Sequence, residues 1–163
     1  MDKEKTVYNG VVDVSIILVS LFENPLRNSA LDFLEKVLAN KISAAIPTST
    51  FLGAYHIAIN CLLCPKDLVA KEIKETLKFA FPCLIEDISL EVVNEAIDIA
   101  VSYNIESWDG YLVSLARNLR ASIVYSLDRD FQKVPDISLV IPFNEEELME
   151  YHKWLKKLKK RQH

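Results

Sequence analysis

The sequence predicts an α/β protein, a three-layer α/β/α sandwich with a central parallel sheet of four to five strands. Two observations favour this class. Short apolar runs, such as residues 11–12 and 123–125, alternate with longer stretches whose apolar residues recur at helix spacing. Strands separated by helices pair in parallel, and their helices cover both faces of the sheet. With 163 residues, half of them apolar, the chain can bury a real core, so we expect one domain over residues 1–163.

Five short apolar runs are the expected strands. Asp13 directly follows the first run, Pro47 closes the second, and the third comes after Pro82. Asp128 directly follows the fourth run. The expected strands are residues 7–12, 43–46, 83–88, 123–127 and 139–141. These boundaries place an aspartate after the first strand and another after the fourth.

Helical stretches lie between the strands. The pair Asn24-Pro25 breaks the first stretch, and Ser89 and Ser107 are the residue type that caps helix N-termini. The expected helices are residues 15–22, 26–38, 49–64, 66–79, 89–100, 107–119 and, amphipathic and basic at its end, about 145–161.

The ends and the apolar runs of the chain indicate a cytoplasmic protein. The first residues carry mixed charge, and Asp13 interrupts the apolar run that follows, which differs from a secretion signal. No stretch reaches the roughly 18 apolar residues of a membrane span, so no membrane partner is expected. Cys61, Cys64 and Cys83 are odd in number and lie in apolar surroundings, which predicts reduced, buried thiols.

The charge of the chain is divided. The net charge is −4, but residues 151–163 contain six cations and no acid, so the rest of the chain carries −10. An acidic body with a basic tail is not typical of a generally basic nucleic-acid binder. The tail has two interpretations: cations that stabilise a helix C-terminus, or a local surface that guides phosphates.

Four aspartates stand where strands end or helices begin: Asp13, Asp109, Asp128 and Asp130. In an open parallel sheet, ligands bind beyond the carboxyl ends of the strands, so Asp13 and Asp128 are close if their strands are neighbours. Crowded carboxylates repel one another and attract a divalent cation. Oxygen ligands without an accompanying histidine and cysteine set favour Mg²⁺ or Mn²⁺ over zinc.

These motifs resemble those of the PIN domain family, including its VapC-like toxin ribonucleases. Val-Val-Asp13, Trp-Asp109-Gly-Tyr-Leu-Val-Ser-Leu-Ala and Tyr-Ser126-Leu-Asp128-Arg-Asp130-Phe resemble the three acidic motifs, and the resemblance runs from about residue 7 to 143. It implies an α/β nuclease that cleaves RNA with Mg²⁺ or Mn²⁺. It further implies that Asp13, Asp109 and Asp128 bind the metal directly or through water, that Asp130 extends the set, and that Ser126 holds a carboxylate.

One position departs from the family pattern. PIN nucleases usually carry a glutamate on the helix after the second strand, and the matching residue here is Gly53. A missing carboxylate lowers the negative charge that attracts the metal. We expect Glu106 to support the set, and His56 is the other residue that could compensate for the loss.

Two functions therefore follow from the sequence. The leading one is a metal-dependent endoribonuclease, the toxin of a toxin–antitoxin pair, with RNA, an antitoxin protein and a second copy of the chain as partners. The alternative is a PIN-like domain that binds RNA or protein without cutting. A phosphoacceptor receiver domain and an aspartyl phosphatase fit poorly, because Ser15 stands where the phosphatase requires a second aspartate.

Overall fold

In the computed structural model, which describes residues 6–86 and 88–162, five parallel strands form one sheet. The strands are β1 (Gly10–Val12), β2 (Ala44–Pro47), β3 (Leu84–Ile85), β4 (Ile123–Tyr125) and β5 (Ser138–Val140). Their order is β3-β2-β1-β4-β5, with Val11 opposite both Ala45 and Val124. The predicted neighbours β1 and β4 are therefore adjacent, and strand order reverses between them.

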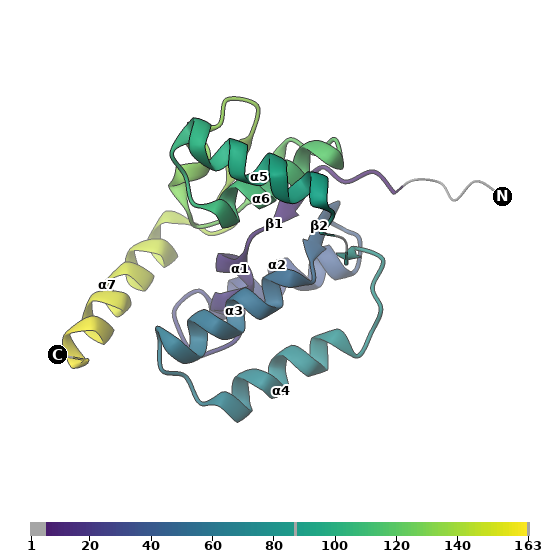
Figure 1. Ribbon diagram of the computed structural model, residues 1–163. Helices are drawn as coiled ribbons and strands as arrows, with labels where there is room; N and C mark the ends of the chain where they lie inside the picture. The colour runs from purple at the N-terminus through teal and green to yellow at the C-terminus, as the bar shows by residue number, and fades with distance from the viewer. Residues whose placement is uncertain (1–5, 87, 163) are drawn as a thin grey trace.

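Helices cover both faces of this sheet (Figure 1). On one face lie α1 (Val14–Ser20), α2 (Arg27–Leu38) and α3 (Ser49–Asn60), with α4 (Lys66–Leu77) packed outside α3. On the other face lie α5 (Leu90–Tyr103) and α6 (Ser107–Asn118). The predicted three-layer α/β/α sandwich is confirmed. No helix in the described part of the chain is both long and apolar enough to cross a membrane.

The strands β1, β3 and β4 are shorter than predicted, most of all β3, whereas β2 and β5 have the predicted length and are shifted by one residue. β3 contains two residues where the sequence predicts six, and Asp87 of the predicted range lies outside the described residues. β3 is an edge strand that pairs only with β2, so nothing on its outer side extends the ladder. The central strand β1, in contrast, is completely buried between two neighbours.

Two predictions were wrong in detail. The N-cap of α6 is Glu106, whose extended backbone precedes the helix, and Ser107 is already helical; adjacent polar residues leave such a boundary uncertain by one position. Cys61 is exposed because it follows the last turn of α3, where the chain turns at the surface. Cys64 is partly buried and Cys83 is buried, as free thiols.

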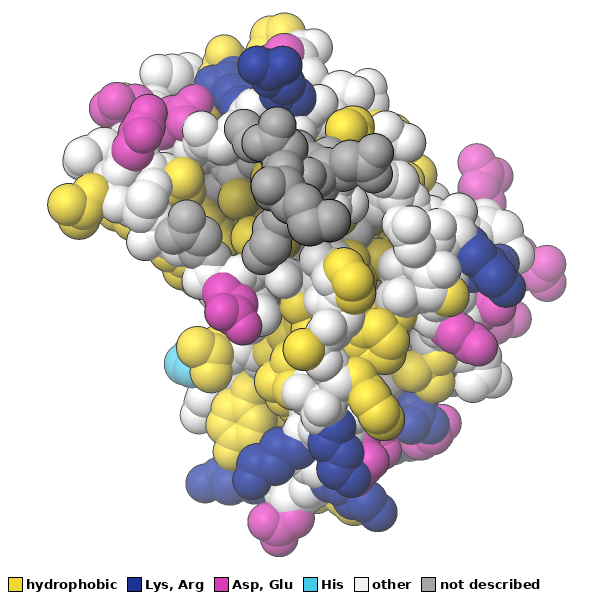
Figure 2. Space-filling view, turned by 90° about the vertical axis from the view of Figure 1, so that its right-hand side faces the viewer, with side chains coloured by type: hydrophobic (Ala, Val, Ile, Leu, Met, Phe, Trp, Pro, Cys, Tyr) yellow, Lys and Arg dark blue, Asp and Glu magenta, His cyan; other side chains and the backbone are white. Residues whose placement is uncertain are grey.

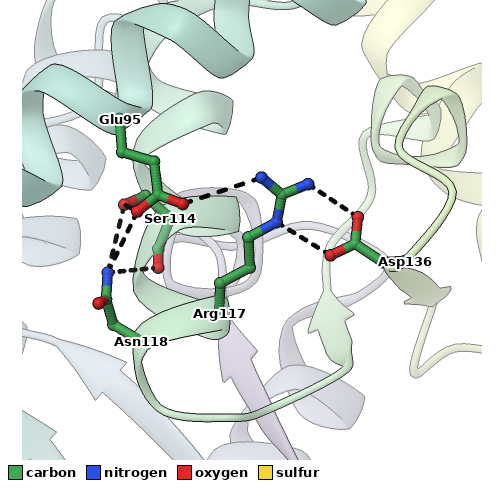
Figure 3. A network of polar contacts seen from close by, with 5 residues as sticks. All are labelled: Glu95, Ser114, Arg117, Asn118 and Asp136. Atoms are coloured by element: carbon green, nitrogen blue, oxygen red, sulfur yellow. Dashed lines mark hydrogen bonds and ion pairs between the residues drawn. The ribbon is translucent and has the colours of Figure 1, made fainter.

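Helices α5 and α6 are fixed against each other at two points. A Cβ atom on Gly110 would overlap the carbonyl oxygen of Ala96, so only glycine permits this approach of the two backbones. At the other end of α6, Arg117 makes two hydrogen bonds to Asp136, and Ser114 donates to Glu95 across a distance of 2.7 Å (Figure 3). The network joins α5, α6 and the segment before β5.

Helix α7 (Glu145–Arg161) leaves the body of the molecule (Figure 1). A capping box between Asn144 and Glu147 starts it, and Trp154 stacks on Phe22 with ring centroids 5.7 Å apart. Beyond Trp154 the cations of α7 are exposed. The predicted basic helix is thus attached by its first half and exposes its charge in the second.

Candidate metal centre

The aspartates lie at the carboxyl end of β1 and β4, where strand order reverses. Asp13 directly follows β1 and caps α1, accepting a hydrogen bond from the backbone of Ser15. Asp128 follows β4 and caps the short 3₁₀ helix η1 (Arg129–Lys133), accepting from the backbone of Asp130 at 2.9 Å. Each aspartate side chain therefore also accepts a hydrogen bond from the backbone at the start of a helix, which fits the preference of aspartate for N-caps.

Asp13 is held by two hydroxyl groups. Ser126 Oγ donates to its Oδ2 at 2.6 Å and Ser15 Oγ donates to the same atom at 2.8 Å. The carboxyl group is only 4% exposed, and this burial raises its pKa, while the hydrogen bonds from Ser126 and Ser15 act in the opposite direction. The hydroxyls therefore favour the ionised form that a metal requires.

Asp109 stands in the first turn of α6 and is 5% exposed. Its Oδ2 is buried and has no hydrogen-bond partner among the described residues. Burial, and after it the negative charges of Asp128, Asp13 and Glu106, together raise the pKa of Asp109 to about 8. A buried carboxylate oxygen without a partner is costly, and a cation would remove the cost.

Among the described residues, Asp109, Asp128 and Asp130 form one possible ligand group, with a carboxylate oxygen of each lying within 4.8 Å of the others. The group contains oxygen donors alone, which suits a hard divalent ion. Asp13 lies outside this group, although its charge acts on Asp109. Asp130 also pairs with Lys133 at 3.1 Å. The residues present therefore fit a divalent cation held by Asp109, Asp128 and Asp130.

A pocket of about 680 Å³ opens over this rim. Asp13, Asp109 and Asp128 form its acidic wall, and Glu106 also lines it. The remaining walls are largely apolar and come from α1, α3, α6 and the segment before α5. They include Leu18, Leu52, Gly53, His56, Ile57, Ile88 and Trp108.

The family of the chain follows from a sequence match over this whole arrangement. The profile of the PIN domain matches residues 10–137, which contain the strands β1 to β4 and all four aspartates and end just before β5. The chain belongs to the PIN domain family. No curated protein matches the chain at a significant level.

Solved structures share the PIN fold at low sequence identity. A toxin–antitoxin complex from Klebsiella pneumoniae superposes with a TM-score of 0.56 and 18% identity, covering 83% of this chain and 98% of the other. The Mycobacterium tuberculosis toxin VapC20, described as cleaving the sarcin-ricin loop, gives 0.61 and 12%, covering 77% and 95%. PAE2754 from Pyrobaculum aerophilum gives 0.56 and 16%, covering 96% and 94%.

Little space is left for a side chain at Gly53, the position where PIN nucleases usually carry a glutamate. A Cβ atom on Gly53 would lie 3.2 Å from Cγ2 of Val14 and 3.6 Å from Cζ2 of Trp108. Val14 and Trp108 therefore occupy the space beside Gly53. His56, one turn further along α3, lines the same pocket, and its Nδ1 lies 3.2 Å from Asn60 Nδ2.

Ser15 belongs to the site although the sequence pattern did not indicate it. Its hydroxyl contacts Asp13, lies 3.2 Å from Ser126 Oγ, and accepts a hydrogen bond from the backbone of Leu127 at 3.0 Å. It thus joins the end of β1 to the segment after β4. The available signal was its position two residues after a capping aspartate, where a serine hydroxyl can reach the carboxylate.

Proposed function

We propose that this PIN domain is a Mg²⁺- or Mn²⁺-dependent endoribonuclease of the cytoplasm, and that it is the toxin of a toxin–antitoxin pair. The observation that carries the proposal is the buried, unpartnered Oδ2 of Asp109 inside a group of three carboxylates. Among the described residues, Asp130 is the one member of this group that pairs with a cation, Lys133. A metal nuclease explains the arrangement without further assumptions.

The residues divide the work. Asp109, Asp128 and Asp130 would hold the metal, and Asp13 would bind it through water, fixed in place by Ser126 and Ser15. Glu106 adds negative charge at the pocket wall. When bound, the metal lowers the pKa of a water and neutralises charge on a phosphoryl oxygen.

Cleavage of RNA by purified protein tests this proposal. We expect Mn²⁺ to support cleavage of a single-stranded RNA, and Asp128→Asn and Asp13→Asn to lower the rate by at least about a hundredfold, because such groups contribute several kcal/mol. Asp32→Asn, which changes an exposed aspartate of α2 paired with Lys36, is the matched control. Equal rates in all variants would refute the assignment.

The departure at Gly53 favours one second function, a PIN domain that binds RNA without cutting it. One carboxylate fewer weakens the attraction for the metal, whereas the pocket and the basic half of α7 are unaffected. RNA binding without metal-dependent turnover in the same assay would support this function and exclude the first.

An antitoxin is the proposed protein partner. An apolar hollow of about 410 Å³ lies between α1, α2 and α4, lined by Leu31, Leu34, Phe51 and Phe81 among others. Figure 2 shows apolar side chains gathered on the face where α4 ends. An amphipathic helix that lays its apolar side into such a hollow is a common mode of recognition.

A second copy of this single domain is the other proposed partner. Leu90, Val93, Ile97 and Val101 recur along α5 at helix spacing, and each is at least 45% exposed. A stripe of this length on a monomer is unusual, since soluble proteins seldom expose contiguous apolar surface. Replacing Val93 and Ile97 by lysine should convert a dimer to a monomer in sedimentation experiments.

A further inference from the structure

The pocket above the aspartates is rich in negative charge and poor in donors for a phosphate. Four carboxylates line it, those of Asp13, Glu106, Asp109 and Asp128. Among the described residues that line it, none is a lysine or an arginine, and His56 is the one with a basic side-chain nitrogen. A cation at the carboxylates would attract an RNA phosphate, whose other oxygens would still require hydrogen-bond donors.

The other donors of the pocket are engaged or cannot be reached. Ser15 donates to a carboxylate of the site, and the hydroxyl of Ser49 lies 3.1 Å from that of Tyr111. Nε1 of Trp108 is inaccessible to solvent. His56, in contrast, is exposed, so a ligand in the pocket can reach it.

His56 projects from α3 on the side that faces the site. It stands three residues after Gly53, and residues with this spacing lie on the same side of a helix. A Cβ atom on Gly53 would face Val14 and Trp108, the chain neighbours of two of the aspartates. Helical side chains also tilt towards the helix N-terminus, so His56 covers the turn that contains Gly53.

The contact with Asn60 fixes which ring nitrogen of His56 carries the proton. Asn60 Nδ2 donates to the backbone carbonyl oxygen of His56 at 3.0 Å, so the nitrogen of this amide faces the histidine. The same Nδ2 lies 3.2 Å from Nδ1 of the ring. An amide nitrogen only donates, so Nδ1 accepts and the proton of the neutral ring is on Nε2. Nε2 has no hydrogen-bond partner among the described residues.

This arrangement suits an anion better than a metal ion. A metal ligand needs the lone pair of Nε2, which moves the proton to Nδ1 and brings two donors, Nδ1–H and the amide of Asn60, face to face. A phosphate oxygen is an acceptor, so Nε2–H can donate to it without any rearrangement. We therefore do not expect His56 to replace the missing carboxylate at position 53 as a metal ligand.

We propose that His56 is a substrate-binding residue, whose Nε2 donates a hydrogen bond to a phosphate oxygen of the RNA at the metal site. The proposal rests on the proposed function, because it takes RNA as the ligand. Gly53 supports it: a glutamate there would stand one turn from His56 and accept a hydrogen bond from the imidazole, whereas glycine leaves the N–H available.

A nucleotide without an internucleotide bond tests the donor without turnover. In ¹⁵N-labelled protein with Mg²⁺, at about pH 8, where free histidine is neutral, the imidazole signals are followed by NMR during titration with uridine 5′-monophosphate and with uridine. We expect the proton of His56 on Nε2, and a saturable shift with the monophosphate that uridine does not produce. His152, exposed on α7, is the internal control. A proton on Nδ1, no shift at His56, or equal shifts with the two ligands would overturn the proposal.

Cleavage kinetics provide the second test. His56→Ala removes the donor, and we expect it to raise KM for a single-stranded RNA about tenfold with little change in kcat. His56→Gln keeps an N–H and should restore KM to within about threefold of the original. His152→Ala is the matched control, and Mn²⁺ affinity measured by calorimetry should be equal in all variants.

The outcomes separate this proposal from the proposed function. Cleavage with the same KM in the wild type and in His56→Ala would refute the role of His56 and leave the nuclease function intact. A weaker affinity for Mn²⁺ in His56→Ala would assign the imidazole to the metal and likewise overturn the proposal. Because the NMR titration needs no cleavage, it also tests His56 in a protein that binds RNA without cutting it.

Discussion

Ser126 and Asp13 join the ends of the two central strands, with the serine hydroxyl 2.6 Å from the carboxylate. The same hydroxyl accepts a hydrogen bond from the backbone of Asp128 at 2.9 Å. One fully buried side chain therefore fixes the positions of two aspartates from strands that are far apart in the sequence. The separation of these carboxylates depends on it.

Replacing Ser126 by alanine should weaken both the fold and the metal site. Loss of a hydrogen bond to a charged group costs about 1.5–3 kcal/mol, and the pKa of Asp13 should rise because a group that lowers it is gone. Urea unfolding measures the first effect and Mn²⁺ titration the second. Ser122→Ala, on an exposed serine just before β4, is the control and should change neither.

The stability of the metal-free protein should fall as the pH rises. The pKa of Asp109 increases from 3.8 to about 8 on folding, so the unfolded chain loses this proton first. The contribution of the group to stability is complete below pH 3.8 and is lost as the pH rises to about 8, an effect of about 3–5 kcal/mol. Urea unfolding at several pH values between 5 and 8 measures this loss of stability. In Asp109→Asn this slope should be much smaller, with the raised pKa of Asp13 accounting for what remains, whereas Asp32→Asn should retain the full slope.

Metal affinity should increase with pH and with a restored glutamate. Mn²⁺ must displace the proton of Asp109, so binding should tighten up to about pH 8. Gly53→Glu combined with Val14→Ala supplies a carboxylate and removes the methyl groups that would crowd it, and should tighten binding about tenfold or more. Calorimetric titration measures both effects. Val14→Ala alone is the control, and equal affinity in the two variants would contradict the role of position 53.

Gly110→Ala should destabilise the protein although alanine favours helices. The new methyl group would overlap the carbonyl oxygen of Ala96, and such overpacking costs about 1–3 kcal/mol or more. Gly53→Ala is the matched comparison, because it meets only a side chain, at 3.2 Å, and gains up to about 1 kcal/mol of helix propensity. Thermal unfolding should separate the two variants clearly. Equal midpoints would show that α5 can move away from α6.

The basic half of α7 should bind RNA through phosphates. Lys156→Gln together with Lys157→Gln should weaken RNA binding at low salt and reduce the slope of log affinity against log salt by about 1.4 if both lysines contact phosphates. The pair Lys66→Gln and Lys71→Gln on the exposed side of α4 removes the same charge elsewhere. Unchanged slopes in the α7 variant would assign its cations to helix stability alone.

The sequence was sufficient for the layers of the fold and for the order of the elements, because apolar periodicity reports directly on burial. It could not determine the length of β3, since the number of paired residues at a sheet edge depends on tertiary contacts. The N-cap of α6 was misplaced because Glu106 and Ser107 are both compatible with a helix start. Cys61 has apolar neighbours along the chain, but in the folded structure it is exposed at the end of α3.

The candidate site was predictable to a similar degree. Strand ends and family motifs identified the four aspartates, and β1 and β4 are indeed neighbours. What the sequence could not supply is geometry: that Asp13 is bound by two serines while Asp109 has an oxygen without a partner. The position of the proton on the imidazole of His56 was equally invisible, because it depends on the contact with Asn60.

The unpartnered oxygen of Asp109 makes this rim a frustrated part of the fold. At other places local preferences and tertiary contacts agree, for example in the capping box of α7 and the glycine contact between α5 and α6. Here like charges are concentrated in a buried position, and the fold tolerates the conflict because the surrounding core is stable. A cation that bound at this rim would remove the conflict, and metal binding and folding would then be coupled in a single equilibrium.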